Sequence, residues 1–182
     1  MEYRSDRLVF RAFGEEDFDL FYSVFSDGDV MRYTLMDACT SAEALRPYFQ
    51  TVLQNNETTE NRRTYEYAVY TASTGDFIGL ADIEIHYNEK GGSGEIGYLL
   101  LPAHWGRGFA TEIARTLLRI CFSHLGLHRV CARCNGNNAQ SEKIMQKTGM
   151  KKAGVFRKVR YKDGRWDDEI RYDILAEEWI QA

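Results

Sequence analysis

The stretch WGRGFATE, from Trp105 to Glu112, constrains the fold most because it joins two elements of different kinds. The apolar run before it, EIGYLLL, is typical of a buried strand and stops at Pro102. The run after it, EIARTLLRICFSHLG, has the periodicity of a helix that reaches about Leu125. Glycine at a helix entrance costs roughly 0.5–1 kcal/mol relative to alanine, so stability alone does not account for the two glycines.

A strand, a glycine-bearing turn and a helix N-terminus together favour binding of an anion. The first N–H groups of a helix lack intrahelical partners, and the helix dipole attracts negative charge. Gly106 and Gly108 would let oxygen atoms approach the backbone, and Arg107 adds a positive charge. The pattern predicts a cradle for phosphate or pyrophosphate. The alternative is a tight loop that merely needs glycine.

Two common phosphate-binding motifs do not fit this stretch. A P-loop requires a Lys-Ser/Thr pair after its last glycine, and Phe109 and Ala110 stand there. A dinucleotide-binding fingerprint requires a third glycine, and Thr111 takes its place. The strands before the motif are also predicted to form an antiparallel meander and not the first strand of a βαβ unit.

The hydrophobic pattern predicts one α/β (α+β) domain over residues 1–182 in the order β α α β β β α β α β β. Strands are expected over 7–13, 64–71, 76–87, 94–101 and 129–135, followed by a hairpin over 151–175 that turns at Asp163-Gly164. Helices are expected over 15–26, 41–55, 112–125 and 138–149, with Pro47 interrupting the second. Polar loops are expected over 55–63 and 88–94.

Charge and composition exclude some classes of function. A formal net charge of −4 argues against a nucleic-acid partner as the main function. The N-terminal MEYRSDRLVF has no long apolar segment, which predicts neither a signal peptide nor a membrane span. We therefore expect a cytoplasmic protein with no membrane partner.

The run CFSHLGLHRVCARC brings Cys121, His124, His128, Cys131 and Cys134 close together in sequence. Such residues can hold zinc. The last two cysteines, however, fall in a predicted strand, where positions three apart point to opposite faces. We expect ordinary reduced cysteines and no metal.

The residues from Trp105 to Ala110 resemble the acyl-CoA-binding motif Gln/Arg-x-x-Gly-x-Gly/Ala of the GNAT N-acetyltransferase superfamily, departing from it at the first position. Together with GEIGYLL upstream and Asn138 to Ser141 downstream, the motif is similar to the RimJ/RimL-type, ribosomal-protein-alanine N-acetyltransferase-like branch. The resemblance implies a GNAT fold, in which a mixed central sheet contains a splayed parallel strand pair and carries flanking helices. It also implies acetyl-CoA as co-substrate and an amine acceptor.

The resemblance further implies where acetyl-CoA would bind. Its pantetheine arm would lie between the splayed strands, and its pyrophosphate would rest on the amides of the glycine-bearing turn. The implied cofactor-binding residues are Leu99, Leu100, Leu101, Trp105, Gly106, Arg107, Gly108, Phe109, Ala110, Thr111, Asn138 and Ser141.

Acetyl transfer consumes a neutral amine, and only about one lysine-like amine in 10³ is neutral at pH 7. A general base relieves that shortage. Glu95, on the predicted cofactor strand, is the first candidate; its alternative is a solvated or salt-bridged side chain. Glu84, on the adjacent strand, is the second. By the resemblance, Ser141 is the candidate acid, since Met145 stands where many members carry a tyrosine.

The acceptor stays open at this level. The branch acetylates protein N-terminal amines, whereas relatives acetylate polyamines, amino acids or antibiotics. A non-catalytic acyl-CoA-binding module is a third alternative. The oligomeric state, a homodimer among the options, is not fixed by the sequence.

Overall fold

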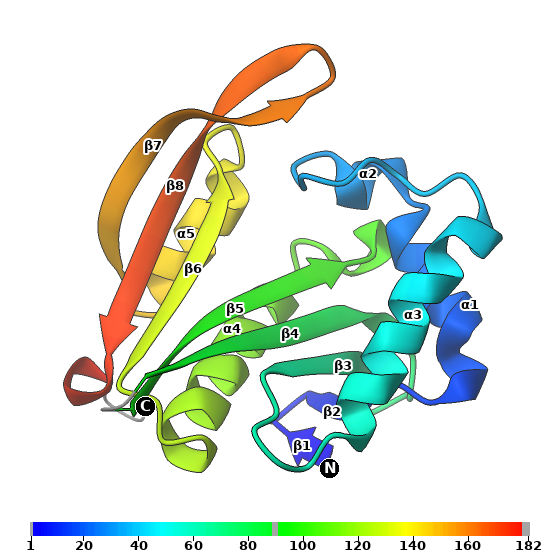
Figure 1. Cartoon of the computed structure of the whole chain (residues 1–182), viewed down its shortest axis with the longest axis horizontal. Coiled ribbons are helices and arrows are strands. Elements are labelled where there is room, and N and C mark those ends of the chain that lie inside the picture. The colour runs from blue at the N-terminus through cyan, green and yellow to red at the C-terminus, as the bar shows by residue number, and fades with distance from the viewer. Residues whose placement is uncertain (1, 89–90, 180–182) are drawn as a thin grey trace.

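The computed structural model describes residues 2–88 and 91–179. Within them, eight strands form one mixed sheet in the order β1-β2-β3-β4-β5-β6-β8-β7 (Figure 1). The strands are β1 (Glu2–Arg4), β2 (Leu8–Ala12), β3 (Thr64–Thr71), β4 (Phe77–Asn88), β5 (Gly91–Leu100), β6 (Arg129–Asn135), β7 (Lys151–Lys162) and β8 (Arg165–Leu175). The α-helices are α1 (Phe18–Phe25), α2 (Gly28–Met31), α3 (Ala42–Glu57), α4 (Phe109–Arg119) and α5 (Ala139–Lys147).

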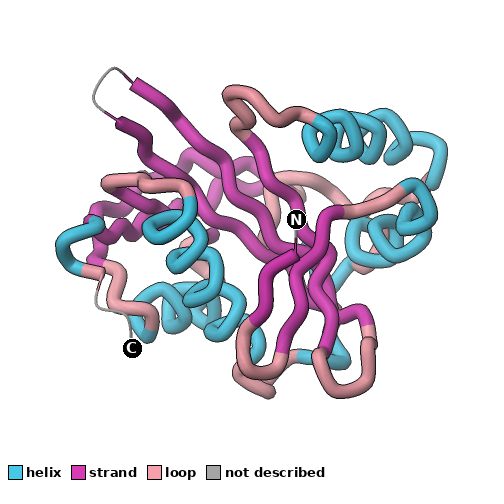
Figure 2. The backbone as a smooth tube through the Cα atoms, turned by 90° about the horizontal axis from the view of Figure 1, so that it is seen from below, coloured by secondary structure: helices cyan, strands magenta, loops and turns pink. Residues whose placement is uncertain are grey.

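Helices cover both faces of the sheet, as Figure 2 shows, and each face has its own hydrophobic core. On one face, α4 and α5 pack on β-strand residues such as Ile83 and Val130. On the other, α1, α2 and α3 pack an aromatic cluster around Phe21 and Phe49 against Leu80. Alternate residues of β4 and β5 therefore belong to different cores, and this alternation decides which side chains face which side of the sheet.

The predicted antiparallel meander is confirmed, since β2, β3, β4 and β5 pair in that order and antiparallel. The hairpin of β7 and β8 turns at Asp163-Gly164 as expected, both with positive φ. Strand β5 then pairs with β6 in parallel, but only through Ser93–Arg129, Gly94–Val130 and Glu95–Cys131. Beyond these residues β5 continues to Leu100 while β6 follows β8, so the two strands diverge (Figure 1). The expected splayed parallel pair is confirmed.

Several predicted boundaries are wrong. The loop expected over 88–94 is strand at residue 88 and over 91–94, because β4 runs to Asn88 and β5 begins at Gly91. Its residues 89–90 lie outside the described residues. Helix α3 continues through Pro47 because Leu45, Phe49 and Val52 bury its inner face, which offsets the hydrogen bond that proline removes.

Two short elements were not predicted, and one helix ends differently. Strand β1 adds three residues to the sheet edge, and α2 is a helix of four residues. The helix expected to reach about Leu125 is α-helical only to Arg119 and ends in a π-helical turn over Ile120–His124. No helix within residues 2–88 and 91–179 is both long and apolar enough to cross a membrane.

Candidate active site

The turn between β5 and α4 has the geometry of an anion cradle. Gly106 and Gly108 adopt φ of +70° and +79°, a region that side chains disfavour. Helix α4 begins directly after Gly108, and no side chain caps it, so the N–H groups of its first turn lack intrahelical partners. A Cβ added at Gly106 would meet no atom within 4 Å, and one at Gly108 would meet only Arg7 Nη2, at 3.5 Å. The space over this turn is open to a ligand.

Two arginines lie against the same turn. The guanidinium of Arg7 lies 4.7 Å from the ring centroid of Phe109, and that of Arg107 lies 5.1 Å from it. Arg7 Nε also pairs with Glu112 Oε2 at 2.7 Å, and its Nη1 donates to the carbonyl of Arg107 at 3.1 Å. Sequence reasoning missed Arg7, because this residue, just before β2, meets a turn about a hundred residues later only in the folded chain, through its contacts with Glu112 and Arg107.

Trp105 ties the turn to the end of β5. Its indole Nε1 donates to the carbonyl of Leu100 at 2.7 Å, and the N–H of Leu101 donates to the carbonyl of Ile78 at 3.0 Å. Backbone direction alternates along a strand, so Leu99, like Leu101, faces β4, whereas Tyr98 and Leu100 face the gap beside β6. The backbone of Leu99 to Leu101, which the resemblance implies as cofactor-binding, is thus partly used within the chain. The backbone groups that face the gap are the N–H and C=O of Tyr98 and the N–H of Leu100.

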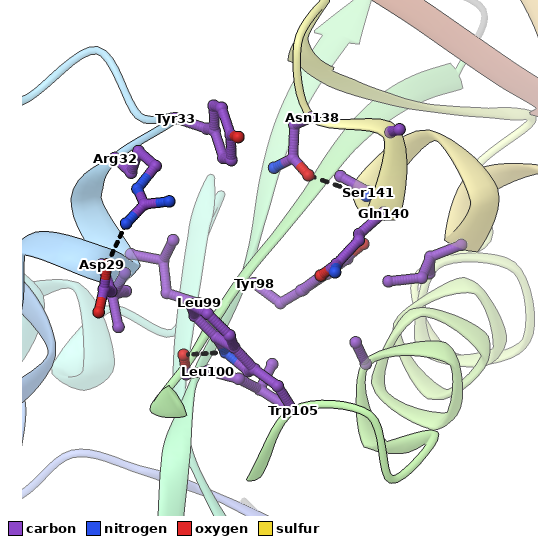
Figure 3. A pocket seen from close by; sticks show the side chains of 14 residues that line it. Asp29, Arg32, Tyr33, Tyr98, Leu99, Leu100, Trp105, Asn138, Gln140 and Ser141 are labelled. Carbon is purple, nitrogen blue, oxygen red and sulfur yellow. Dashed lines mark hydrogen bonds and ion pairs between the residues drawn. The ribbon is translucent and has the colours of Figure 1, made fainter. Parts of the chain in front are cut away.

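A cavity of about 310 Å³ opens beside this gap (Figure 3). We call it the cofactor cavity. It is lined by Asp29, Val30, Arg32, Tyr33, Tyr98, Leu99, Leu100, Trp105, Ala110, Asn138, Ala139, Gln140, Ser141 and Ile144. Its walls come from β5, α2, α5 and the start of α4, so the two sides of the splay meet in it.

Asn138 caps α5 and also faces the cofactor cavity. Its Oδ1 accepts a hydrogen bond from the N–H of Ser141 at 3.1 Å. Its Nδ2 makes no hydrogen bond among the described residues and lies on the cavity side in Figure 3. Capping and ligand binding are therefore compatible at this side chain.

Ser141 lies at the inner end of the cofactor cavity, beside Tyr98 and Cys134. The hydroxyl of Tyr98 is buried and has no hydrogen-bond partner among the described residues. Burial raises the pKa of Tyr98 to about 12 and that of Cys134 to about 11, and the neighbouring Ser141 side chain acts in the opposite direction on both. Both groups stay protonated at neutral pH. Met145 is buried in the core, so no tyrosine acid stands there.

A second cavity, also about 310 Å³, adjoins the first, and we call it the carboxylate cavity. The two share Val30, Tyr33, Tyr98, Leu99, Asn138 and Ser141. The carboxylate cavity extends over β4, β5 and β6 to Asp82, Glu95, Arg133 and Arg160. Two molecules, one in each cavity, would meet where β5 and β6 diverge.

The two sequence-predicted carboxylates differ in their surroundings. Glu95 lines the carboxylate cavity, and its Oε1 lies 2.6 Å from Arg133 Nε, which is the salt-bridge alternative considered for it. Glu84 stands directly across from Glu95 on β4 but does not line either cavity. Its side chain is 52% exposed, and its carboxylate lies 3.9 Å from His86 Nε2.

Sequence reasoning missed Asp82. This residue stands opposite Gly97 on β5 and opposite Glu66 on β3. A Cβ on residue 97 would lie 2.5 Å from Asp82 Oδ1, so the carboxylate occupies the space that glycine leaves. Burial, then the charges of Glu66, Glu95 and Glu84, raises the pKa of Asp82 to about 7. The pairing of Asp82 with a glycine depends on strand register, which the sequence pattern does not specify.

The β7–β8 hairpin closes one side of the carboxylate cavity. Its tip reaches toward α2 in Figure 1, and Lys162 Nζ donates to the carbonyls of Met31 at 2.7 Å and Met36 at 2.6 Å. The ammonium also lies 3.8 Å from Asp37 Oδ1, and the Lys162 side chain is only 12% exposed. Lys162 therefore joins two walls that come from opposite ends of the chain.

The cysteine–histidine run is dispersed in the structure. Cys121 and Cys134 are buried, and Cys131 Sγ donates to the carbonyl of Gly94 at 3.2 Å. In the part of the chain that the structure describes, no three His, Cys, Asp or Glu side chains are grouped to hold a metal ion. The absence of a metal stays a prediction.

Comparisons with known proteins place this geometry in context. A family model described as an acetyltransferase (GNAT) domain matches residues 7–151. An uncharacterized N-acetyltransferase of Bacillus subtilis (strain 168), YnaD, is 30% identical over 98% of this chain and 99% of its own. A putative ribosomal N-acetyltransferase of the same organism, YdaF, is 29% identical over 61% of this chain and 58% of its own. The crystal structure of spermidine N-acetyltransferase from Vibrio cholerae in complex with CoA and spermine has a TM-score of 0.83 at 22% identity, covering 96% of this chain and 98% of that one.

Proposed function

The chain belongs to the GNAT acetyltransferase family and uses acetyl-CoA, and from this premise we propose that its acceptor is a small cationic primary amine. It is an N-acetyltransferase with the GNAT fold, as the resemblance implied. One observation carries the proposed acceptor: Asp82 lines the carboxylate cavity without an ion pair to any described residue. Such a carboxylate attracts an ammonium group.

The residues at the turn and the gap fit the parts of acetyl-CoA. The left-handed glycines and the uncapped start of α4 suit a pyrophosphate, and Arg107 adds positive charge beside it. Arg7 lies against the same turn but is paired with Glu112. The N–H of Leu100 and the amide of Asn138 are placed to hydrogen-bond the pantetheine arm. Each such bond contributes on the order of 1 kcal/mol net. The remaining predicted cofactor residues, from Leu99 to Thr111, form the frame around these groups.

The acceptor would approach from the carboxylate cavity, on the sheet face that carries Glu66, Asp82, Glu84 and Glu95. Only Glu95 among these four has an arginine ion pair among the described residues. Opposite charges across a binding site speed encounter and select the partner. The complex of the Vibrio cholerae relative with spermine supports a polyamine-like amine as the class to test first.

Ser141 is proposed to assist departure of the sulfur. Its place between the two cavities suits a hydroxyl that hydrogen-bonds the leaving thiolate. The buried Tyr98 hydroxyl beside it could return a proton to Ser141. Glu95 and Glu84 remain the sequence-based candidates for the base, and the contact with Arg133 favours an orienting role for Glu95.

A protein N-terminal amine is the second candidate acceptor. The similarity of the motif to the RimJ/RimL-type branch and the relative named as a putative ribosomal N-acetyltransferase support it. A peptide α-amine, with a pKa near 7.7–8.0, also needs less help from a base. The hydrogen bonds from Lys162 to the carbonyls of Met31 and Met36 favour the smaller acceptor. They close one side of the carboxylate cavity, and a polypeptide acceptor would have to extend out of that cavity.

An acceptor screen tests the proposal. The purified chain is mixed with acetyl-CoA and with spermidine, other diamines, amino acids, aminoglycosides or peptides with free N-termini, and released CoA thiol is recorded. We expect kcat/KM for small cationic amines to exceed kcat/KM for the peptides with free N-termini by at least tenfold. A higher value for peptides would refute the small-amine acceptor and support the N-terminal one.

A further inference from the structure

The structure assigns the proton-accepting role to Asp82: we infer that its carboxylate, and not that of Glu95, takes the proton that the acceptor amine loses. This inference rests on the proposed function. Its basis is the position of the Asp82 carboxylate over Gly97, where it lines the carboxylate cavity next to the splay. A side chain on residue 97 would fill that position.

The two other carboxylates are less suited to the role. Glu95 is held by Arg133 at 2.6 Å, and accepting a proton would break that ion pair. Glu84 lines neither cavity, and its side chain is 52% exposed. Asp82 has neither constraint, since no hydrogen bond or ion pair to it is found among the described residues.

The charges around Asp82 come from every element packed against it. Glu66 lies across from it on β3, Glu84 follows on the same strand, and Glu95 lies on β5. Arg133 on β6 is the positive neighbour, and Tyr48 of α3 faces the same acidic group. Arg160 of β7, which also lines the cavity, is paired with Glu169 at 2.8 Å.

These surroundings match a base that works near neutral pH. Burial and the three carboxylates raise the pKa of Asp82 to about 7, whereas an exposed aspartate is near 3.9. A base is most effective when its pKa lies close to the working pH. An arriving ammonium group would also favour the ionised form of Asp82, because it offsets the neighbouring negative charges.

The step balances as follows. The amine nitrogen forms a bond to the acetyl carbonyl carbon, and the bond from that carbon to the CoA sulfur breaks. The electron pair of the broken bond leaves on sulfur, which receives a proton from Ser141 or water. An ammonium nitrogen loses two protons in all. The first moves to the Asp82 carboxylate, directly or through one water, frees the lone pair that attacks, and is then released to solvent. The second leaves nitrogen after the attack and, through water, replaces the proton that Ser141 or water gave to sulfur.

The test compares matched variants with the best amine from the screen. Asp82→Asn should lower kcat/KM by about 10²–10⁴-fold at pH 7, with the loss shrinking at higher pH as the amine deprotonates unaided. The acidic limb of the pH–rate profile should disappear with it. Asp19→Asn, at an exposed site on α1, makes the same chemical change and should leave kcat/KM and the acidic limb of the pH–rate profile unchanged.

Gly97→Ala tests position without removing the carboxylate. Its Cβ would lie 2.5 and 2.9 Å from the two Asp82 oxygens, so the carboxylate must turn away. We expect a loss of at least tenfold in kcat with acetyl-CoA affinity, measured by calorimetry, within a few-fold of wild type. Full activity in Gly97→Ala would count against the inference.

The outcomes separate the two proposals. If the wild-type chain turns over no small amine, the proposed function fails. If it does turn over an amine but Asp82→Asn keeps its activity and its acidic limb, the inference fails alone. A loss of that limb in Glu95→Gln in place of Asp82→Asn would return the role to Glu95.

Discussion

Replacing Gly108 by alanine separates the conformational role of this residue from its role in binding. At φ of +79°, a side chain costs about 1–2 kcal/mol, part of which is offset by a stiffer unfolded chain. Within the protein the new Cβ would meet only Arg7 Nη2, at an ordinary contact distance of 3.5 Å. We therefore expect a folded variant whose melting temperature falls by roughly 2–4 °C for each kcal/mol lost.

The effect on acetyl-CoA should be larger. The added Cβ lies where pyrophosphate oxygens are proposed to approach the backbone, and we expect affinity to fall by at least about tenfold, or 1.4 kcal/mol. Calorimetric titration with acetyl-CoA measures it. At a ligand concentration of about 100 times Kd, the wild type should gain about 2.7 kcal/mol of stability, and the variant clearly less at that same concentration.

Gly126→Ala is the matched control. Gly126 has a φ of +64°, a Cβ there would meet nothing within 4 Å, and it lies in the loop before β6, at the paired end of the β5–β6 seam. The Gly126→Ala variant should lose as much unfolding free energy as Gly108→Ala and should keep its affinity for acetyl-CoA. Unchanged binding in Gly108→Ala, or equal losses of affinity in both variants, would refute the cradle.

Three further substitutions and one metal analysis have defined outcomes. Lys162→Met removes the ammonium that joins the hairpin to α2 and should raise the KM for the amine several-fold, with acetyl-CoA affinity unchanged by calorimetry. Trp105→Phe loses the indole bond to Leu100 and should cost about 0.5–1.5 kcal/mol of unfolding free energy in urea, with weaker acetyl-CoA binding. Burial opposes ionisation of Asp17, but Arg11 and nearby donors hold its pKa below the usual value. The stability that the ionised carboxylate contributes is therefore present above about pH 4 and is lost as the pH falls. Unfolding curves of Asp17→Asn should approach those of the wild type between about pH 5 and 3. Elemental analysis should find well under one zinc per chain, and stoichiometric zinc lost together with the fold would reverse this expectation.

The sequence predicted best where one residue pattern ran the length of an element. The bounds expected for β3 and β6 match the structure, and both strands are rich in β-branched, aromatic and other apolar residues. Helix α2 has four residues and β1 has three, too few to show a period. The π-helical end of the helix after Arg119 also leaves no pattern in the sequence, because it changes one hydrogen-bond register and not the residue types.

The site was predictable where it depends on local chemistry. Two glycines before a helix indicate an anion site wherever they occur, and Asn138 followed by Ser141 indicates a helix cap. The partners of the carboxylates were not predictable. Arg133 reaches Glu95 only because β5 and β6 run in parallel at one register. Asp82 finds its space only because the antiparallel register of β4 and β5 places it beside Gly97.

The short parallel pairing between β5 and β6 also divides the polypeptide at a single point in its sequence. All strands up to β5 lie on one side of this seam, and β6, β7 and β8 lie on the other. Three residue pairs hold the strands together there, and the proposed ligand lies along the same line. The molecule therefore has the layout of a split-protein reporter: two fragments cut in the loop before Arg129 should reassemble more tightly when acetyl-CoA is present than when it is absent.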